Sequence, residues 1–212
     1  KDIFGKLNVD LNYFYMNRND LHVNIADQAD LDNPLSFYFF TSNIKHGINE
    51  GIDLNLNLNV NNSTNLFFNA GLLLNTVRDA FSYSNGLDIN GDVNYINQEQ
   101  RQQARAPQYT INAGIEAYIT NSLFIRLETV LKDKYYYFDN QNEMSKAYQL
   151  INLNSRYQIN QGLSISLNIN NVLDEKYSIH GFYFSLDGFM DPQLYESPGD
   201  PANYSIKLDY KF

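Results

Sequence analysis

The sequence of 212 residues contains no cysteine and no tryptophan, and only 18% of its residues are charged. Without cysteine, the chain has no disulfide framework, no thiolate metal site and no thiol nucleophile. No run of 18 or more apolar residues occurs, which excludes a transmembrane helix. The formal net charge of -9 argues against nucleic acid as a partner, because proteins that bind nucleic acids usually present a basic patch.

What the sequence does contain is a long series of alternating apolar and polar residues. In the segment "NYSIKLDYKF", Tyr204, Ile206 and Leu208 alternate with polar residues, and "GIDLNLNLNV" at 51–60 repeats the pattern. Successive side chains of a strand point to opposite faces, so each segment has one apolar face and one polar face. No segment shows the 3.6-residue apolar repeat of a helix, and the chain is therefore predicted to be all-β.

The alternation predicts nine strands, the third of which needs a bend near Gly47 and Gly51. The predicted bounds are 6–16, 20–28, 38–60, 64–78, 108–120, 122–137, 146–159, 163–175 and 203–212. Short polar turns are expected at 17–19, 61–63, 120–121 and 160–162, and longer links at 29–37, 79–107, 138–145 and 176–202. Alternating short and long connections predict an antiparallel up-and-down meander with its short turns at one end.

Three features favour an outer-membrane β-barrel over a soluble sheet. Alternation alone does not distinguish them, because a strand that covers a soluble core shows it too. Short turns at one end, long loops at the other and strands of at least ~9–11 residues are typical of membrane barrels. Aromatic residues also lie near the strand ends on the apolar side, namely Tyr13, Tyr15, Tyr109, Tyr157, Tyr204, Tyr210 and Phe212. The apolar face is therefore predicted to contact lipid.

The polar face is then predicted to line an aqueous lumen, since a dry core would not accept so many polar groups without dense pairing. The inward residues are predicted to be Asn55, Asn57, Asn59, Asn112, Glu116, Arg126, Glu128, Asn154, Arg156, Asn168, Lys207 and Asp209.

The stretch from "LNINNVLDEKY" to "SPGDPANYSIKLDYKF" resembles the carboxyl end of the TonB-dependent outer-membrane transporters. Val172-Leu173 stands where that family usually has Leu-Phe, and Asp200 where it usually has Arg. "SNIKHGINEGIDLNLNLNV", "ARAPQYTINAGIEAYI" and "DKYYYFDNQNEMSKAYQLINLNSRYQI" are similar to further segments of the family, in the same order. The resemblance covers most of the chain.

The resemblance implies a 22-stranded barrel that encloses a plug domain and imports a scarce nutrient complex, most often a ferric siderophore. Residues 1–212 are then expected to be a carboxyl-terminal barrel segment, or one piece of a split receptor, without the plug and the amino-terminal strands. Its edge strands would pair with strands supplied elsewhere, because open edges are not tolerated in hydrocarbon. The alternative is a self-contained outer-membrane barrel of eight or ten strands that acts as an adhesin, an anchor or a narrow pore. No catalytic constellation is visible, so an enzyme is not expected.

The resemblance also implies the location and the partners. The expected location is the outer membrane of a Gram-negative bacterium. The expected partners are the remainder of the barrel and its plug, the TonB complex acting through an amino-terminal box, the barrel-assembly machinery, lipid and lipopolysaccharide, and a small-molecule substrate. No cofactor is expected, and iron would be present only within the transported chelate.

The last strand is expected to carry the barrel-assembly signal on Leu208, Tyr210 and Phe212, and the alternative is that these residues only face lipid. Substrate contact is expected at the long-loop end, where aromatic rings could stack on a ligand and arginine could pair with an anionic chelate. The alternative is that these aromatic residues form the girdle and pack the loops together. The candidates are Arg101, Arg105, Tyr135, Tyr136, Tyr137, Phe138, His180, Phe182, Tyr183 and Phe184.

One loop, "DINGDVNYINQE" at 88–99, has the oxygen spacing of an EF-hand, with Asp88, Asn90, Asp92, Asn94 and Glu99 at the ligand positions. Val93 occupies the position that requires glycine, and no helices flank the loop, so coincidence is favoured over calcium binding. His22, His46 and His180 lie far apart in the sequence and lack metal-ligand spacing.

The predicted faces can be tested on two neighbouring residues. Leu56→Arg is expected to destabilise the assembled barrel by ~2–4 kcal/mol if Leu56 lies near the bilayer midplane, whereas Asn57→Arg should be tolerated much better. The measurement is the heat-modifiable electrophoretic mobility of each variant in outer-membrane preparations. Equal assembly of the two variants would reject the assignment of the faces.

Overall fold

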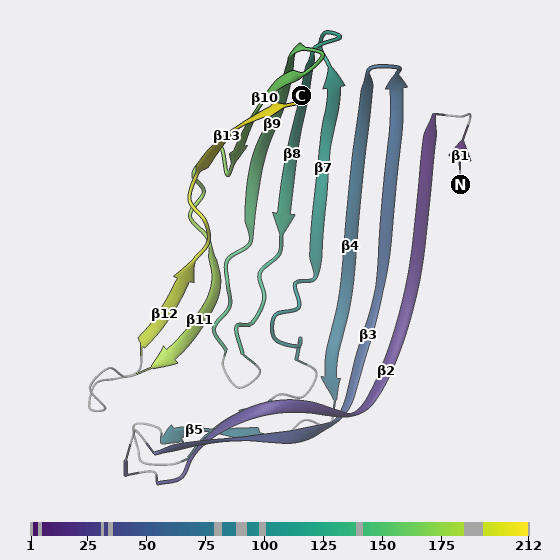
Figure 1. Ribbon diagram of the computed structural model, residues 1–212. Helices are drawn as coiled ribbons and strands as arrows, with labels where there is room; N and C mark the ends of the chain where they lie inside the picture. The colour runs from purple at the N-terminus through teal and green to yellow at the C-terminus, as the bar shows by residue number, and fades with distance from the viewer. Residues whose placement is uncertain are drawn as a thin grey trace.

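The computed structural model describes residues 2–3, 6–30, 32–33, 36–78, 82–87, 93–97, 101–138, 142–184 and 193–211. The regular elements of these residues are all strands, and nine of them form one antiparallel sheet in the order β1-β2-β3-β4-β7-β8-β9-β10-β13 (Figure 1). No helix in this part of the chain is long and apolar enough to cross a membrane. The predicted all-β antiparallel fold is confirmed.

The main sheet consists of β1 (Asp2–Ile3), β2 (Leu7–Gln28), β3 (Phe37–Asn61), β4 (Thr64–Arg78), β7 (Tyr109–Tyr118), β8 (Leu123–Lys132), β9 (Tyr148–Asn160), β10 (Leu163–Asn170) and β13 (Asn203–Tyr210). The long connections contain two hairpins that the alternation did not predict. They are β5 (Ser82–Leu87) with β6 (Val93–Asn97), and β11 (Ser178–Phe184) with β12 (Gln193–Pro198).

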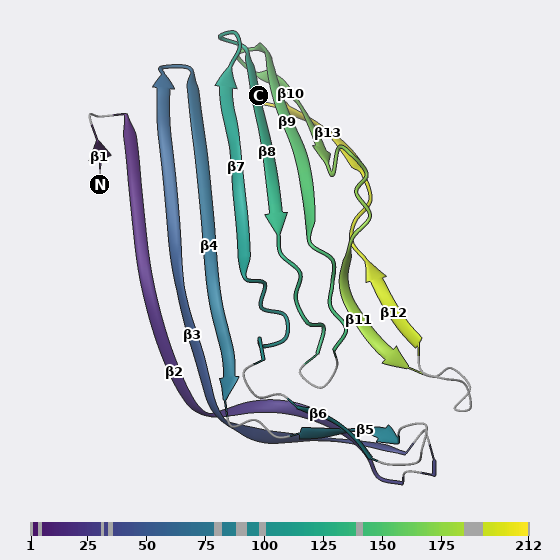
Figure 2. The same ribbon diagram turned by 180° about the vertical axis from the view of Figure 1, so that it is seen from behind.

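The connections are sorted by length, as predicted, with the tight turns at one end of the sheet and the long connections at the other (Figures 1 and 2). Short polar side chains close the turns by accepting main-chain hydrogen bonds, which is typical of Asx and ST turns. Asn61 Oδ1 accepts from the amide of Ser63 at 2.8 Å, and Asn160 Oδ1 accepts from that of Gly162 at 2.9 Å. Thr120 Oγ1 accepts from the amide of Leu123 at 3.0 Å.

The turn predicted at 17–19 is wrong. Strand β2 runs through these residues, so the strands predicted at 6–16 and 20–28 form one continuous strand. Asn17 pairs with Ile48, and Arg18 pairs with Gly47. Polar residues that resemble a turn are accommodated here because Nη2 of Arg18 donates to Oδ1 of Asn49 at 3.2 Å. Where Arg78 ends β4 opposite His46, β2 and β3 continue as a two-stranded ribbon that turns aside, so the bend predicted in the third strand is present (Figures 1 and 2).

The two faces of the sheet differ as the alternation predicts. Exposed large hydrophobic residues follow the apolar face, including Tyr13, Leu72 and Ile206, which is 72% exposed. Tyr118 is an exception, because it is exposed on the polar face. A contiguous apolar surface of this extent is not found on ordinary soluble monomers and requires a cover.

On the polar face, two aromatic rings cover glycines of the neighbouring strand. Phe67 pairs with Gly114, and Phe14 pairs with Gly51. A β-carbon at Gly114 would lie 2.6 Å from Cζ of Phe67 and closer still to the carbonyl oxygen of Leu127. The guanidinium of Arg126 stacks on the Phe67 ring at 4.4 Å from its centroid. Both glycines are therefore required by the close approach of these rings, in the manner of cross-strand aromatic rescue.

Strand β10 ends in a tight loop rather than continuing through residues 171–175 as predicted. Asn171 is buried with φ of 52°, and its side-chain Nδ2 donates to the carbonyls of Glu175 at 2.9 Å and Asp200 at 3.1 Å. Its Oδ1 accepts from the amide of Glu175 at 2.8 Å. Oδ1 of Asp174 accepts from the amide of Ala202 at 2.9 Å. This loop therefore ties the end of β10 to the start of β13.

Strand β8 likewise stops at Lys132, and residues 133–137, predicted as its continuation, form irregular structure with a single bridge from Tyr136 to Met144. The main chain there pairs with the return segment instead, since the amide of Ser145 donates to Tyr135 O at 2.8 Å.

Removing the Asn171 side chain should weaken this junction. We expect Asn171→Ala to lower the free energy of unfolding by roughly 2–3 kcal/mol, because buried main-chain groups lose their partners. The neighbouring Asn170 is exposed, and its side chain donates one hydrogen bond, to Asn203 at 2.9 Å. Asn170→Ala should therefore change stability by less than about 0.5 kcal/mol. Thermal unfolding of both variants in detergent makes the comparison, and similar losses would contradict the role given to Asn171.

The aromatic cover of Gly114 can be tested with a second glycine that also lies within a strand. Gly114→Ala should cost about 1–3 kcal/mol through overpacking against Phe67. A β-carbon at Gly71 would have its nearest neighbour at 3.5 Å, the Oδ1 of Asp53, which is ordinary contact. Gly71→Ala is accordingly expected to be almost neutral in the same unfolding measurement. A neutral Gly114→Ala would show that both Phe67 and the main chain at Leu127 can move away at no cost.

Candidate functional site

Three segments meet at the long-connection end of the sheet. Residues 101–108 run beside β4, where the amide of Val77 donates to Arg101 O at 2.9 Å and that of Leu73 to Gln108 O at 2.8 Å. The amide of Arg105 donates to Tyr136 O at 2.8 Å, which joins this segment to the residues that follow β8. Strand β11 supplies the third segment. Candidates from three separate parts of the sequence are thereby brought together.

The two arginines of this region have different surroundings. Arg101 is 9% exposed, donates from Nη2 to Phe138 O at 3.1 Å and lies over the Tyr136 ring at 3.9 Å from its centroid. Arg105 is exposed, lies over the Phe138 ring at 5.4 Å, and has φ of 58°. Arg101 therefore holds the loops together, whereas Arg105 presents its charge to solvent.

Tyr135 and Tyr137 are enclosed, with exposures of 4% and 1%, and their rings meet edge to face at 6.1 Å. The hydroxyl of Tyr135 donates to Ile179 O at 2.9 Å, and that of Tyr137 to Glu196 Oε1 at 2.5 Å. Burial, followed by the hydrogen bond to Glu196, raises the pKa of Tyr137. Both tyrosines are neutral donors that attach β11 and β12 to the segment after β8.

A row of four rings, Phe138, His180, Phe182 and Tyr195, begins beside Arg105. Phe138 and His180 have centroids 5.2 Å apart, and those of His180 and Phe182 are 6.3 Å apart. Phe182 stacks on Tyr195 at 5.9 Å and is 41% exposed. This ring row and Arg105 together form a partly exposed surface that combines flat aromatic faces with one positive charge.

Not every candidate falls in this surface. Tyr136 is partly exposed, and its ring lies under the guanidinium of Arg101. The main chain of Tyr183 and Phe184 is part of β11, but their side chains are not among the described parts of the structure. Tyr195 and Glu196 were not predicted as site residues, because "QLYESP" lacks the regular alternation that would have indicated the strand that carries them. They enter the cluster because Phe182 pairs with Tyr195, and Gly181 with Glu196.

The other candidate sites remain predictions. Of the residues with EF-hand spacing, Asp88, Asn90, Asp92 and Glu99 lie outside the described residues, and Asn94 is described by its main chain in β6. Within the described ranges, no group of three or more His, Cys, Asp or Glu residues is placed to hold a metal ion. Nδ1 of His46 lies 3.0 Å from Oδ1 of Asn19. Leu208 and Tyr210 are exposed on the apolar face of β13, and Phe212 is outside the described part.

The chain matches the family model described as "TonB dependent receptor-like, beta-barrel" over residues 2–172. A search of curated proteins finds no match. The matched residues include three of the segments that resemble the family, at 42–60, 104–119 and 133–159, whereas most of the carboxyl-terminal stretch lies beyond the match.

Solved structures of the same architecture cover the chain almost completely. The siderophore receptor PiuA from Acinetobacter baumannii is 15% identical, with a TM-score of 0.72 over 100% of this chain and 27% of its own. For the ferric yersiniabactin uptake receptor FyuA from Yersinia pestis, the identity is 13% and the TM-score 0.73, over 99% of this chain and 28% of its own. The copper transporter OprC is 12% identical, with a TM-score of 0.70 over 98% of this chain and 29% of its own.

The chain thus spans little more than a quarter of the length of these receptors, and at such low identity they show its fold. The predicted architecture, a portion of a larger transmembrane barrel, is confirmed. Proteins of the matched family are outer-membrane transporters rather than enzymes. The family match and the shared barrel architecture show that this chain belongs to the TonB-dependent receptors of the bacterial outer membrane.

Proposed function

We propose that the protein takes part in the uptake of a ferric siderophore, or a chemically similar metal chelate, across the outer membrane. The observation that carries this proposal is the partly exposed ring row beside Arg105 at the long-connection end of the sheet. Aromatic faces and a guanidinium suit a ligand that is flat in part and negatively charged, as catecholate and carboxylate chelates are.

The enclosed residues support this surface by fixing the segments that carry it. Tyr135 binds the main chain of β11, and Tyr137 binds Glu196 of β12, so the ring row is mounted on a hairpin that is anchored at two points. Such anchoring reduces the conformational entropy that a ligand would have to remove on binding. Two of the similar structures, those of a siderophore receptor and of a ferric yersiniabactin uptake receptor, support a chelate as the solute.

We further propose that the chain forms the carboxyl-terminal part of a barrel wall, completed by other strands and enclosing a plug. Among the residues that the structure describes, β13 pairs with β10 alone, so its other edge has main-chain groups without a sheet partner. In hydrocarbon such an edge requires another strand. Energy for transport would come from the TonB complex, and iron would be carried as part of the solute.

The binding surface can be tested on the receptor in detergent with ferric complexes of a catecholate and of a carboxylate siderophore. Arg105→Ala should raise Kd for the preferred complex by about tenfold or more, because a charge-assisted hydrogen bond contributes roughly 1.5–3 kcal/mol. His180→Ala should produce a smaller increase through the loss of one ring. Isothermal titration calorimetry gives both values.

The matched control is Lys146→Ala, which removes an exposed positive charge from the neighbouring connection before β9. It should leave Kd unchanged. If Lys146→Ala and Arg105→Ala weaken binding equally, only general electrostatic attraction is at work and the proposed surface is not the binding site.

A further inference from the structure

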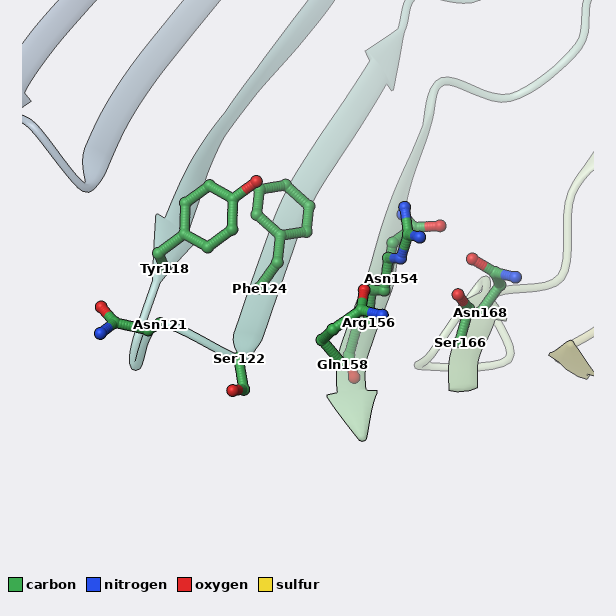
Figure 3. Close-up of a pocket in the computed structure, with 10 residues that line it drawn as sticks. Tyr118, Asn121, Ser122, Phe124, Asn154, Arg156, Gln158, Ser166 and Asn168 are labelled. Atoms are coloured by element: carbon green, nitrogen blue, oxygen red, sulfur yellow. The ribbon is translucent and has the colours of Figure 1, made fainter. Parts of the chain in front are cut away.

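A cavity of about 470 Å³ opens on the polar face at the opposite end of the sheet, beside the short turns (Figure 3). It extends from β7 to β10, and its lining includes Tyr118, Phe124, Asn154, Arg156, Gln158 and Asn168. It is therefore separate from the ring row, which lies beyond the other ends of the same strands.

The two sides of the cavity have different chemistry. Tyr118 and Phe124 form an aromatic side, with centroids 5.2 Å apart and an interplanar angle of 57°. Asn154, Gln158 and Asn168 form an amide side, from which Arg156 projects (Figure 3). Arg156 is the only ionisable group besides the Tyr118 phenol among the lining residues, and none of them is a carboxylate.

Arg126 and Arg156 lie on the same face of the sheet, but among the described residues only Arg126 forms ion pairs with carboxylates. Arg126 pairs with Glu116 and, at 2.6 Å, with Glu128. Nη2 of Arg156 donates to the hydroxyl of Ser164 at 3.3 Å, and no carboxylate of the described ranges forms an ion pair with Arg156. Asp209, which pairs with Ser164 across β10 and β13, is held by Lys207 at 2.7 Å.

The amide groups beside Arg156 are already oriented by their neighbours. Nε2 of Gln158 donates to the carbonyls of Asn160 at 2.6 Å and Leu163 at 3.2 Å, and Nδ2 of Asn168 donates to Ser205 Oγ at 3.3 Å. The charged donors available to a ligand are therefore those of Arg156. A guanidinium offers a planar fork of N–H groups that matches a carboxylate in a bidentate arrangement.

We propose that this cavity binds a carboxylate group through Arg156, with the aromatic side covering the carbon atoms attached to it. One guanidinium balances one carboxylate, whereas a phosphate dianion would retain net charge in the cavity. The carboxylate comes either from an acidic side chain of polypeptide inside the barrel or from a free carboxylic acid in the lumen. The inference does not depend on which solute the receptor imports.

Carbodiimide cross-linking of the full receptor tests the proposal and separates the two sources. In the Arg156→Lys variant, the reagent joins the new amine to any carboxylate that contacts it. Asn57→Lys is the control, because Asn57 is an exposed residue of β3 on the polar face and outside the cavity. We expect about tenfold more product at position 156 than at position 57, since only position 156 holds a carboxylate in place.

Mass spectrometry of the product identifies the source. A cross-linked peptide that contains Asp or Glu shows that polypeptide supplies the carboxylate. A benzoate adduct, formed when millimolar benzoate is present, shows that a free acid supplies it. Equal yields at positions 156 and 57 in both arms would overturn the proposal. Should Arg156→Lys fail to fold, Gln158→Lys places an amine on the same side of the cavity and is judged by the same yields. Transport is not measured, so the result is independent of the function proposed above.

Discussion

Main-chain hydrogen bonding between neighbouring strands is the interaction on which the rest of this structure depends. A membrane offers no water to satisfy peptide groups, so every strand that crosses it must pair continuously on both sides. The register meets this requirement from β2 to β10, and β2 remains paired even through the polar run at Asn17 to Asn19. The proposal that another strand pairs with the edge of β13 rests on the same requirement.

Continuous pairing fixes which side chains share a face, and the two ends of the polar face then acquire different chemistry. At the long-connection end, Arg101, Tyr135 and Tyr137 are used to pack the connections, and this leaves the ring row and Arg105 partly exposed. At the short-turn end, Arg156 lies in a cavity on the polar face, and no carboxylate of the described residues forms an ion pair with it. Arg126 lies between these ends and is fully compensated by Glu116 and Glu128.

Prediction from the sequence succeeded where a pattern depends on one strand alone. The alternation in 51–60 and 203–210 assigned the faces, and short polar residues located the turns at 61–63 and 160–162. It failed at Asn17 to Asn19, because a polar run in a strand and a polar turn have the same composition. The hairpin of β11 and β12 was also missed. Its two strands are short and lie within a long connection, where a composition typical of loops does not distinguish a strand from a turn.

The sequence by itself determined the all-β architecture, the two faces and the sorting of the connections, because these follow from a period of two residues and from local turn chemistry. Only the tertiary structure decided which of the candidate aromatic and basic residues are enclosed and which are presented. Tyr137 is covered by Gly181 of a distant hairpin, and Arg156 of β9 lies in a cavity whose lining, drawn from β7 to β10, includes no carboxylate. Contacts between segments far apart in the chain carry no local signature, since they depend on how complete strands are placed side by side.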